Sequence, residues 1–522
     1  FMRSLDRPIF MDGRPHPPAW APHTWTGFST GEWVGNTLKV TTTHLKDGYL
    51  KRGGPQTSDL YTMTEYLTRH DEILTITTVV DDPVYLDEPY VQSTTYLYDP
   101  TASVQMETCN ASAFAENGGT DRHHVPHFLP GQNAAITEWL KNEPWVPAEA
   151  ARGGAKTLYP EYRTKVEKVP ASRSSLTLAT AINSQGPRDG EVHVLPVQGN
   201  VYMLVADGVN LAASVGPDGM LLVNSGAAAM TDKVQAALVR LATASPVPNR
   251  CSGANCPGLQ WGWASPYINT VISSPLPPRP LRYVVNTNDA AEHVGGNAKL
   301  AASGFFPRGG GFGGAVGTNT RSASVIAHES VLNRMSASVN KQPPAYPEAG
   351  WPTDTYFDSL HKLPEYMNGE AVIVYHVPAA TTDGDSLVFF RHSEVIHAGS
   401  LFSTISYPVI DLQKGGSIQG VIDGLNQILD LAVAEYRAQG GTWIIPSRGR
   451  LSDTADVASY RNMLVMIRDR VRDLKQKGQT AAQVKAARPT LDFDGRYGTT
   501  TGPWTTDMFV DAVYRSLLEK KP

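Results

Sequence analysis

An imidazole and a carboxylate stand side by side in the stretch 286–297, at His293 and Glu292. The stretch follows a run with strand character at 281–285, and its Gly-Gly pair precedes a helical pattern. Imidazoles and carboxylates are the usual zinc ligands, and zinc-bound water ionises near neutral pH. A zinc site needs three or four converging ligands, which these two residues alone do not supply. The first question is therefore whether this stretch belongs to a hydrolytic site.

Two other groups of histidines or cysteines have metal-ligand chemistry. Three histidines fall within 121–127, but Pro126 disrupts any helix that would put them on one face, so a solvated loop is favoured. Cys251 and Cys256 are close in sequence and Cys109 is distant, which favours a local disulfide and an oxidising compartment. Two free thiols or half of a metal site remain alternatives, and the sequence does not decide whether the disulfide forms.

The composition is that of a globular protein. The chain has 522 residues, 41% hydrophobic and 18% charged, which favours two or three domains. A net charge of −5 without a basic run argues against nucleic-acid binding and against a polybasic membrane patch. No apolar stretch approaches the roughly 20 residues of a transmembrane helix. The first residue is Phe, and no apolar signal core follows it, so we expect a processed or partial chain. The possible disulfide favours a periplasmic or secreted location.

The elements that must position the chemistry form four segments. Residues 1–110 are β-rich, 111–190 are a mixed linker region, 191–450 alternate strands with helices, and 451–522 are helical. Strands are expected at 33–43, 73–80, 91–98, 192–197, 201–206, 210–215, 220–223 and 281–285, and helices at 132–140, 227–244, 418–437, 460–475 and 506–518. Periodicity alone supports α/β layers.

From about residue 192 to the end, the chain resembles the metallo-β-lactamase superfamily. The likeness is carried by motifs such as Asp-Gly-Met-Leu-Leu-Val (218–223), Ile-Ala-His-Glu-Ser-Val-Leu-Asn-Arg-Met (326–335), Ala-Thr-Thr-Asp-Gly-Asp (380–385) and Gly-Gly-Ser-Ile-Gln-Gly (415–420). It implies an αββα sandwich with a C-terminal helical extension. Residues 7–17 and 31–38 resemble a bacterial β-domain of unknown function, which implies a small β-rich domain before the sandwich.

The family holds two zinc ions with ligands from four loops, and this chain departs from the pattern in each. In the first loop, Asn288 and Ala290 replace histidines and Glu292 replaces an aspartate, while His293 is retained. In the second loop Thr381 replaces a histidine, and in the third loop Ser400 replaces a bridging aspartate. In the fourth loop Arg448 replaces a histidine. An early Asp-Thr-Gly that helps position the first loop becomes Asn-Ser-Gly at 224–226.

These replacements predict a degenerate site without zinc or another cofactor. Alanine cannot ligate zinc, amides and hydroxyls are poor ligands, and a protonated arginine repels a metal. Removing dications would leave acids unpaired, which is costly, so we expect Arg448 to compensate and to pair with Glu292 within about 6 Å. An Arg448 that points into solvent is the alternative.

Several other polar residues are expected to act structurally. His328 and His376 occur in relatives without binding metal, and Asp383 and Asp385 are expected to hold backbone amides. A nucleophilic pair of Ser400 with a histidine three positions earlier is disfavoured, because residues at that spacing on a strand end face different ways.

The leading functional hypothesis is a non-catalytic protein with a structural, assembly or ligand-binding role. Its expected partner is a second copy of itself in a homo-oligomer, or an active paralogue. The main rival is a hydrolase with a rearranged or single-metal site built around Glu292 and His293. A third reading places a small-molecule ligand in the vacated site, or between Trp20, Trp25 and Trp33, which otherwise pack in a core or interface.

Overall fold

The computed structural model describes residues 7–50, 56–101, 124–125, 127–129, 175–243, 280–305, 322–338, 342–433 and 441–517. The three cysteines, most of the histidine-rich segment 121–127 and the helix expected at 132–140 lie outside these residues. The predictions made for them therefore stay predictions.

The chain forms two compact units. The first combines Phe1–His16, His23–Ile182 and Arg461–Pro522, and the second combines Pro17–Pro22 and Asn183–Tyr460. The C-terminal helices thus group with the N-terminal sheet. Within the described residues, no helix is long and apolar enough to span a membrane.

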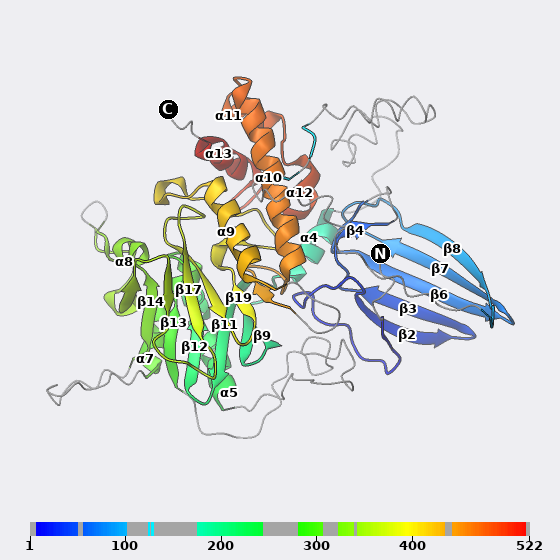
Figure 1. Cartoon of the computed structure of the whole chain (residues 1–522), viewed down its shortest axis with the longest axis horizontal. Helices are drawn as coiled ribbons and strands as arrows, with labels where there is room; N and C mark the ends of the chain where they lie inside the picture. The colour runs from blue at the N-terminus through cyan, green and yellow to red at the C-terminus, as the bar shows by residue number, and fades with distance from the viewer. Residues whose placement is uncertain are drawn as a thin grey trace. The chain divides into compact units, whose positions relative to one another are not determined.

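The first unit contains a six-stranded sheet in the order β1-β2-β3-β6-β7-β8 (Figure 1). Its strands are β1 (Ile9–Phe10), β2 (Phe28–Val34), β3 (Thr37–Thr43), β6 (Thr62–His70), β7 (Ile73–Asp81) and β8 (Tyr90–Leu97). The expectation of one strand at 33–43 is wrong, because the chain reverses at Gly35, whose φ of 64° favours glycine. Two short strands, β4 (Gly48–Tyr49) and β5 (Gln56–Thr57), pair with each other.

The C-terminal helices of the first unit are α11 (Ala481–Ala486), α12 (Leu491–Tyr497) and α13 (Thr506–Ser516). The buried Arg496 of α12 donates two hydrogen bonds to the buried Asp59 carboxylate, at 2.7 and 3.0 Å. Such a paired guanidinium and carboxylate satisfy each other where water is excluded. This contact ties the C-terminal helices to the loop before β6.

The helix expected at 460–475 begins earlier than predicted. It is α10 (Thr454–Gln476), and Asp453 accepts from the backbone N–H groups of Ala455 and Asp456 at its start. An aspartate in that position satisfies amides that have no partner inside the helix. A shorter helix, α4 (Ser175–Ser184), precedes the second unit's first strand.

The second unit contains two sheets. The first has seven strands in the order β15-β14-β13-β12-β11-β10-β9, and the second has five in the order β16-β17-β18-β19-β20. The seven are β9 (Val192–Gln198), β10 (Val201–Ala206), β11 (Val209–Gly216), β12 (Gly219–Val223), β13 (Leu281–Val285), β14 (Ser324–His328) and β15 (Asp354–Tyr356). The five are β16 (Leu360–Lys362), β17 (Val372–Val377), β18 (Asp385–Phe390), β19 (Val395–His397) and β20 (Trp443–Ile445).

Helices cover the outer faces of the two sheets. On the seven-stranded sheet, α5 (Thr231–Ala242) and α7 (Asn297–Ser303) share one buried core with the strands, in which Val234 and Leu300 belong to the helices and Leu211 to β11. On the five-stranded sheet, α9 (Ile418–Leu431) lies close to β17, because Gly424 has no side chain to hold them apart. The predicted αββα sandwich is confirmed (Figure 1).

Helix α9 is shorter than the expected 418–437. It ends at Leu431, and Ala432 adopts an extended conformation. The next residue, Val433, exchanges hydrogen bonds with Thr442, so the chain leaves the helix to approach β20. Further short helices described in this unit are η3 (Ala228–Met230), α6 (Ala291–Val294), α8 (Glu329–Ser336), η5 (Glu348–Gly350), η6 (Gly399–Leu401) and η7 (Leu412–Lys414).

Candidate functional site

The loop after β13 is held in place by Asn224 and Ser225, which follow the end of β12. The Asn224 side-chain oxygen accepts from the Thr287 backbone N–H at 2.9 Å and from the Thr287 hydroxyl at 3.1 Å. Ser225 donates from both its backbone and its hydroxyl to the His293 carbonyl, at 2.7 and 3.0 Å. All of these residues are buried, so the loop and helix α6 have one well-defined position.

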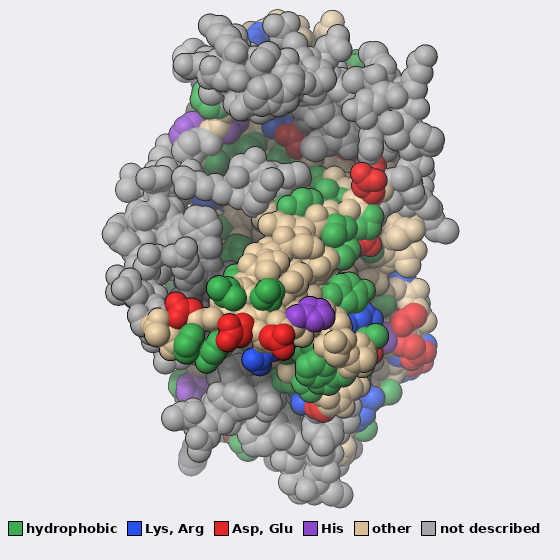
Figure 2. All heavy atoms as spheres, turned by 90° about the vertical axis from the view of Figure 1, so that its right-hand side faces the viewer, with side chains coloured by type: hydrophobic (Ala, Val, Ile, Leu, Met, Phe, Trp, Pro, Cys, Tyr) green, Lys and Arg blue, Asp and Glu red, His purple; other side chains and the backbone are tan. Residues whose placement is uncertain are grey.

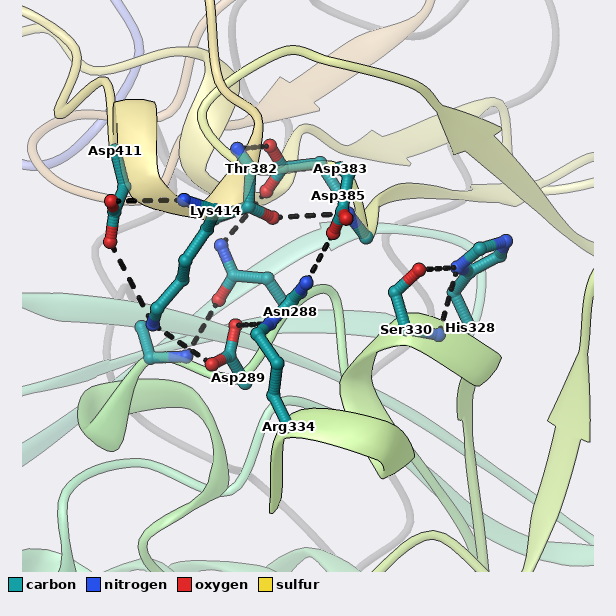
Figure 3. Close-up of polar contacts among 12 residues, drawn as sticks. Asn288, Asp289, His328, Ser330, Arg334, Thr382, Asp383, Asp385, Asp411 and Lys414 are labelled. Atoms are coloured by element: carbon teal, nitrogen blue, oxygen red, sulfur yellow. Dashed lines mark hydrogen bonds and ion pairs between the residues drawn. The ribbon is translucent and has the colours of Figure 1, made fainter. Parts of the chain in front are cut away.

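Two residues at predicted ligand positions, Thr381 and Asn288, bond to one carboxylate, that of the buried Asp385, and a third, Ser400, is joined to them through Asn288. Thr381 donates to both of its oxygens, at 2.8 and 2.7 Å, and Asn288 donates to one of them at 2.9 Å. The Asn288 amide also donates to the Ser400 hydroxyl at 2.9 Å. Figure 3 shows the Asn288 and Asp385 side chains pointing toward each other. Side chains from three of the four loops therefore cross-link one another.

Asp385 is the shared acceptor of this cluster. Burial raises its pKa above the ordinary value, and the hydrogen bonds from Thr381, the Thr382 backbone N–H and Asn288 offset only part of this rise. The bond from the Thr382 amide is 2.6 Å long. The expectation that Asp385 holds a backbone amide is confirmed. Asp383 differs, because its carboxylate pairs with Arg334.

Arg448 and Glu292 form a direct ion pair, as predicted from the sequence. Both side chains are partly exposed, at 21% and 35%. Arg448 also donates to the Gly208 carbonyl at 3.2 Å. The Glu292 carboxylate is thus paired with the Arg448 guanidinium, and the alternative of an arginine directed only into solvent is excluded.

His293 is fully buried, and its hydrogen bonds define which ring nitrogen carries the proton. The Thr287 hydroxyl has one proton, which it donates to Asn224, so at 3.1 Å it accepts from Nδ1 of His293. Nε2 then bears a lone pair, and this buried atom has no hydrogen-bond partner among the described residues. Burial lowers the pKa of His293 to about 4, which keeps the ring neutral.

His397 does not activate Ser400. Its Nε2 lies 3.1 Å from the Asn210 carbonyl, and its Nδ1 accepts from the Gly399 backbone N–H at 3.1 Å. Both ring nitrogens are therefore bound to backbone, and burial lowers the pKa of His397 to about 3. The Ser400 hydroxyl accepts from Asn288. The geometry supports no serine–histidine nucleophile here.

The sequence did not reveal an ion cluster centred on Asp289, which is only 6% exposed. Its carboxylate lies 3.1 Å from the Arg334 guanidinium and 2.9 Å from the Lys414 ammonium. Lys414 also approaches Asp411 at 3.9 Å. Figure 3 shows Arg334 and Lys414 reaching Asp289 from different elements, α8 and η7. The only sequence signal was the opposite charge of residues 45 and 125 positions away.

His328 and His376, which were expected to have structural roles, pack on each other. Their rings are stacked with centroids 3.8 Å apart, and Nδ1 of His328 accepts from the Ser330 amide at 3.3 Å, at the start of α8. Burial, together with the neighbouring His376, lowers the pKa of His328 to about 4. His376 lies 2.8 Å from the Asp383 carbonyl through Nε2. Both rings hold structure at the edge of the site.

The three tryptophans of the N-terminal region do not share one environment. Trp33 is 65% exposed and Trp25 is 46% exposed, so neither is packed in a core of the described residues, and packing at an interface stays a prediction. Trp33 stands near the end of β2, where neither face of the strand is buried. Trp20 rests against His193, with ring centroids 4.6 Å apart.

The donor set around the site does not fit two zinc ions. Asn288, Thr381 and Ser400 present neutral amide and hydroxyl groups, and these already bond to one another or to Asp385. The structure groups no three histidine, cysteine, aspartate or glutamate side chains into a possible metal site, within the residues it describes. Nε2 of His293 is buried and has no hydrogen-bond partner among the described residues, so its lone pair could bind a zinc ion.

Comparisons with known proteins give no sequence match, either to a protein-family model or to a curated protein. Among solved structures, the chain is similar to the DIM-1 metallo-β-lactamase exposed to ceftazidime, with 14% identity and a TM-score of 0.33 over 53% of this chain and 96% of that one. It is also similar to a metallo-β-lactamase from Pontibacter korlensis, with 11% identity and a TM-score of 0.33 over 53% of this chain and 99% of that one. A third similar structure is a stereoselective inverting sec-alkylsulfatase from Pseudomonas sp., with 11% identity and a TM-score of 0.39 over 65% of this chain and 52% of that one. These similarities concern the fold and carry no argument about activity.

Proposed function

We propose that the second unit is a non-catalytic protein of the metallo-β-lactamase fold, with a structural, assembly or ligand-binding role. The observation that carries this proposal is the bonding of Asn288, Thr381 and Ser400 in one network around Asp385. Groups that satisfy one another in a buried site have no need of a metal to compensate them. A homo-oligomer, an active paralogue or a small-molecule ligand is the partner that fits this role.

The ion pair of Arg448 with Glu292 supports the same proposal. A guanidinium stays protonated at any physiological pH, and a dication placed beside it would be repelled. The carboxylate that could attract a metal is already paired. In this proposal, the pair supplies the charge balance that a metal supplies in a hydrolase of this fold.

One observation favours the rival function, a hydrolase with a rearranged or single-metal site at Glu292 and His293. The Nε2 atom of His293 is buried and has no hydrogen-bond partner among the described residues. A neutral imidazole with an open lone pair is a metal ligand or a proton acceptor. The second ligand would be Glu292, which must first leave Arg448.

The two functions are separated by metal analysis combined with assays of a generic ester and a generic lactam. The non-catalytic proposal predicts no zinc-dependent hydrolysis of either substrate. It also predicts that His293→Ala has the same zinc content and the same hydrolysis rates as the wild type. Hydrolysis that needs zinc and disappears in His293→Ala would establish the rival instead. The proposed periplasmic or secreted location rests on Cys251 and Cys256, and a thiol titration of the unfolded protein tests it.

A further inference from the structure

Among the residues that the structure describes, the N-terminal sheet ends in a strand with an open edge, β8. It pairs with β7 along one side, and no described strand lies along the other. The register with β7 runs from Ile73 opposite Leu97 to Val80 opposite Tyr90 without a bulge. After Tyr90, all residues of β8 are exposed. A regular strand of this length with one unpaired side is a template for strand addition.

The backbone groups at the open edge can be identified from one hydrogen bond. The Tyr98 backbone N–H donates to the Glu72 carbonyl at 2.7 Å. Every second residue counted back from Tyr98 therefore directs its backbone N–H and C=O groups to β7. In an antiparallel pair, alternate residues direct both their N–H and their C=O groups away from that partner. The residues that direct these groups to the open edge are Val91, Ser93, Thr95 and Leu97.

This edge lacks the features that usually prevent strand addition. The sequence Tyr-Val-Gln-Ser-Thr-Thr-Tyr-Leu contains no charged residue and no proline. Val91 is 59% exposed, Tyr96 is 53% exposed and Leu97 is 73% exposed. Figure 2, which views the molecule from the right-hand side of Figure 1, shows exposed hydrophobic side chains on this face, with charged side chains beside them. The edge is therefore suited to a partner strand of the same character.

We propose that this partner is β8 of a second copy of the chain, paired antiparallel about a two-fold axis at Thr94. A two-fold axis perpendicular to the sheet leaves each side chain on the same face of the sheet after rotation. Two residues that lie opposite each other across the interface must therefore point to the same face. With Thr94 on the axis, Val91 lies opposite Leu97 of the second copy, and Ser93 lies opposite Thr95. The backbone N–H and C=O groups of all four outward-directed residues then form hydrogen bonds across the interface. With Ser93 on the axis instead, Leu97 is left without a partner.

The side chains agree with this register. Val91 and Leu97 meet as an apolar pair at each end of the interface, and Gln92 meets Tyr96 on the opposite face. Polar Ser93, Thr94 and Thr95 meet at the centre. Because β8 is uncharged, two copies of it do not repel each other. The pairing joins two six-stranded sheets into one continuous sheet.

The test uses analytical ultracentrifugation of the full chain and of two variants, Thr94→Lys and Thr94→Glu. The wild type is expected to form a concentration-dependent dimer. Each variant places two like charges opposite each other on the axis and should raise the dimer dissociation constant by about threefold to tenfold. An equimolar mixture of the two should recover a mixed dimer at least as tight as that of the wild type. Val34→Lys, at a 57% exposed position at the end of β2, should leave the dimer intact.

A wild type that stays monomeric up to about 100 μM would overturn the proposal. A dimer that neither Thr94 variant weakens would overturn it too, as would a mixture that does not recover. Hydrogen exchange of the wild type gives a second measurement that needs no variant. The Ser93 and Thr95 amides should exchange more slowly as the protein concentration rises, and exchange independent of concentration would contradict the pairing.

Discussion

The Arg448 guanidinium contacts the Glu292 carboxylate, although 156 residues separate the two in the chain. The contact joins the segment after β20 to helix α6. It puts a fixed positive charge beside an acidic residue at a position of the first loop where the resemblance places a metal ligand. The pair and the network around Asp385 together account for five of the positions at which the resemblance places metal ligands.

A double-mutant cycle measures the strength of this pair. Arg448→Met, Glu292→Gln and their combination should show a coupling of about 1 kcal/mol in the free energy of unfolding, because both side chains are partly screened by solvent. The exposed pair of Lys233 with Glu191 serves as the control and should couple by about 0–0.5 kcal/mol. Equal coupling in the two cycles would show that the Arg448 pair adds nothing beyond a surface contact.

Asp385→Ala tests the buried network. The change leaves the donors of Thr381, Thr382 and Asn288 without their acceptor, so the free energy of unfolding should fall by about 2–4 kcal/mol. Asp232→Ala is the matched control, because that side chain is 77% exposed and should cost under about 0.5 kcal/mol. Chemical denaturation measures both. A similar small loss in the two variants would mean that the network does not hold the loops.

Stability below neutral pH depends on His293. Its pKa in the folded protein, about 4, lies below the ordinary value of 6.5, so the unfolded chain binds the proton first as the pH falls. His293 therefore has no proton-linked cost above pH 6.5 and an increasing cost between pH 6.5 and about 4.

His293→Asn removes this titration and keeps a donor for the Thr287 hydroxyl. Relative to the variant, the wild type should lose roughly 1 kcal/mol of stability for each pH unit in that window. Denaturation curves at a series of pH values measure the difference. A difference that stays constant from pH 7 to 4 would show that His293 is protonated as readily in the fold as in the unfolded chain.

Asp289→Asn tests the ion cluster that the sequence did not reveal. The variant leaves the Arg334 and Lys414 charges without their buried counterion, and the free energy of unfolding should fall by about 2 kcal/mol. Asp411→Asn is the control, because its carboxylate is 3.9 Å from Lys414 and asparagine can still accept the amide bonds at the start of η7. If the control costs as much as Asp289→Asn, burial of the carboxylate is not what matters.

The sandwich could be predicted because its signals are local. The short strands before α5, the helical period of α9 and the motifs of the family resemblance each lie within a few residues. The pair of Arg448 with Glu292 could be predicted as well, since the expected absence of two dications would leave acids unpaired, and one arginine could compensate for them. Both inferences needed only residue types at known positions.

The remaining features depend on contacts that no local pattern encodes. The partners of Asp289 come from α8 and η7, and only the folded chain brings them together. The hairpin at Gly35 had a local signal, but the β-branched run around it dominated the interpretation. The early end of α9 follows from the bonds of Val433 with Thr442, which are made after the helix has finished.

The most direct test of the non-catalytic proposal is the zinc content of the full chain after dialysis against zinc and then against zinc-free buffer. The bonded state of Asn288, Thr381, Ser400 and Arg448 predicts well under one zinc per chain and no change in thermal stability on adding a chelator. About two zinc ions per chain, or one that His293→Ala removes, would contradict the account and establish a metal site in this fold.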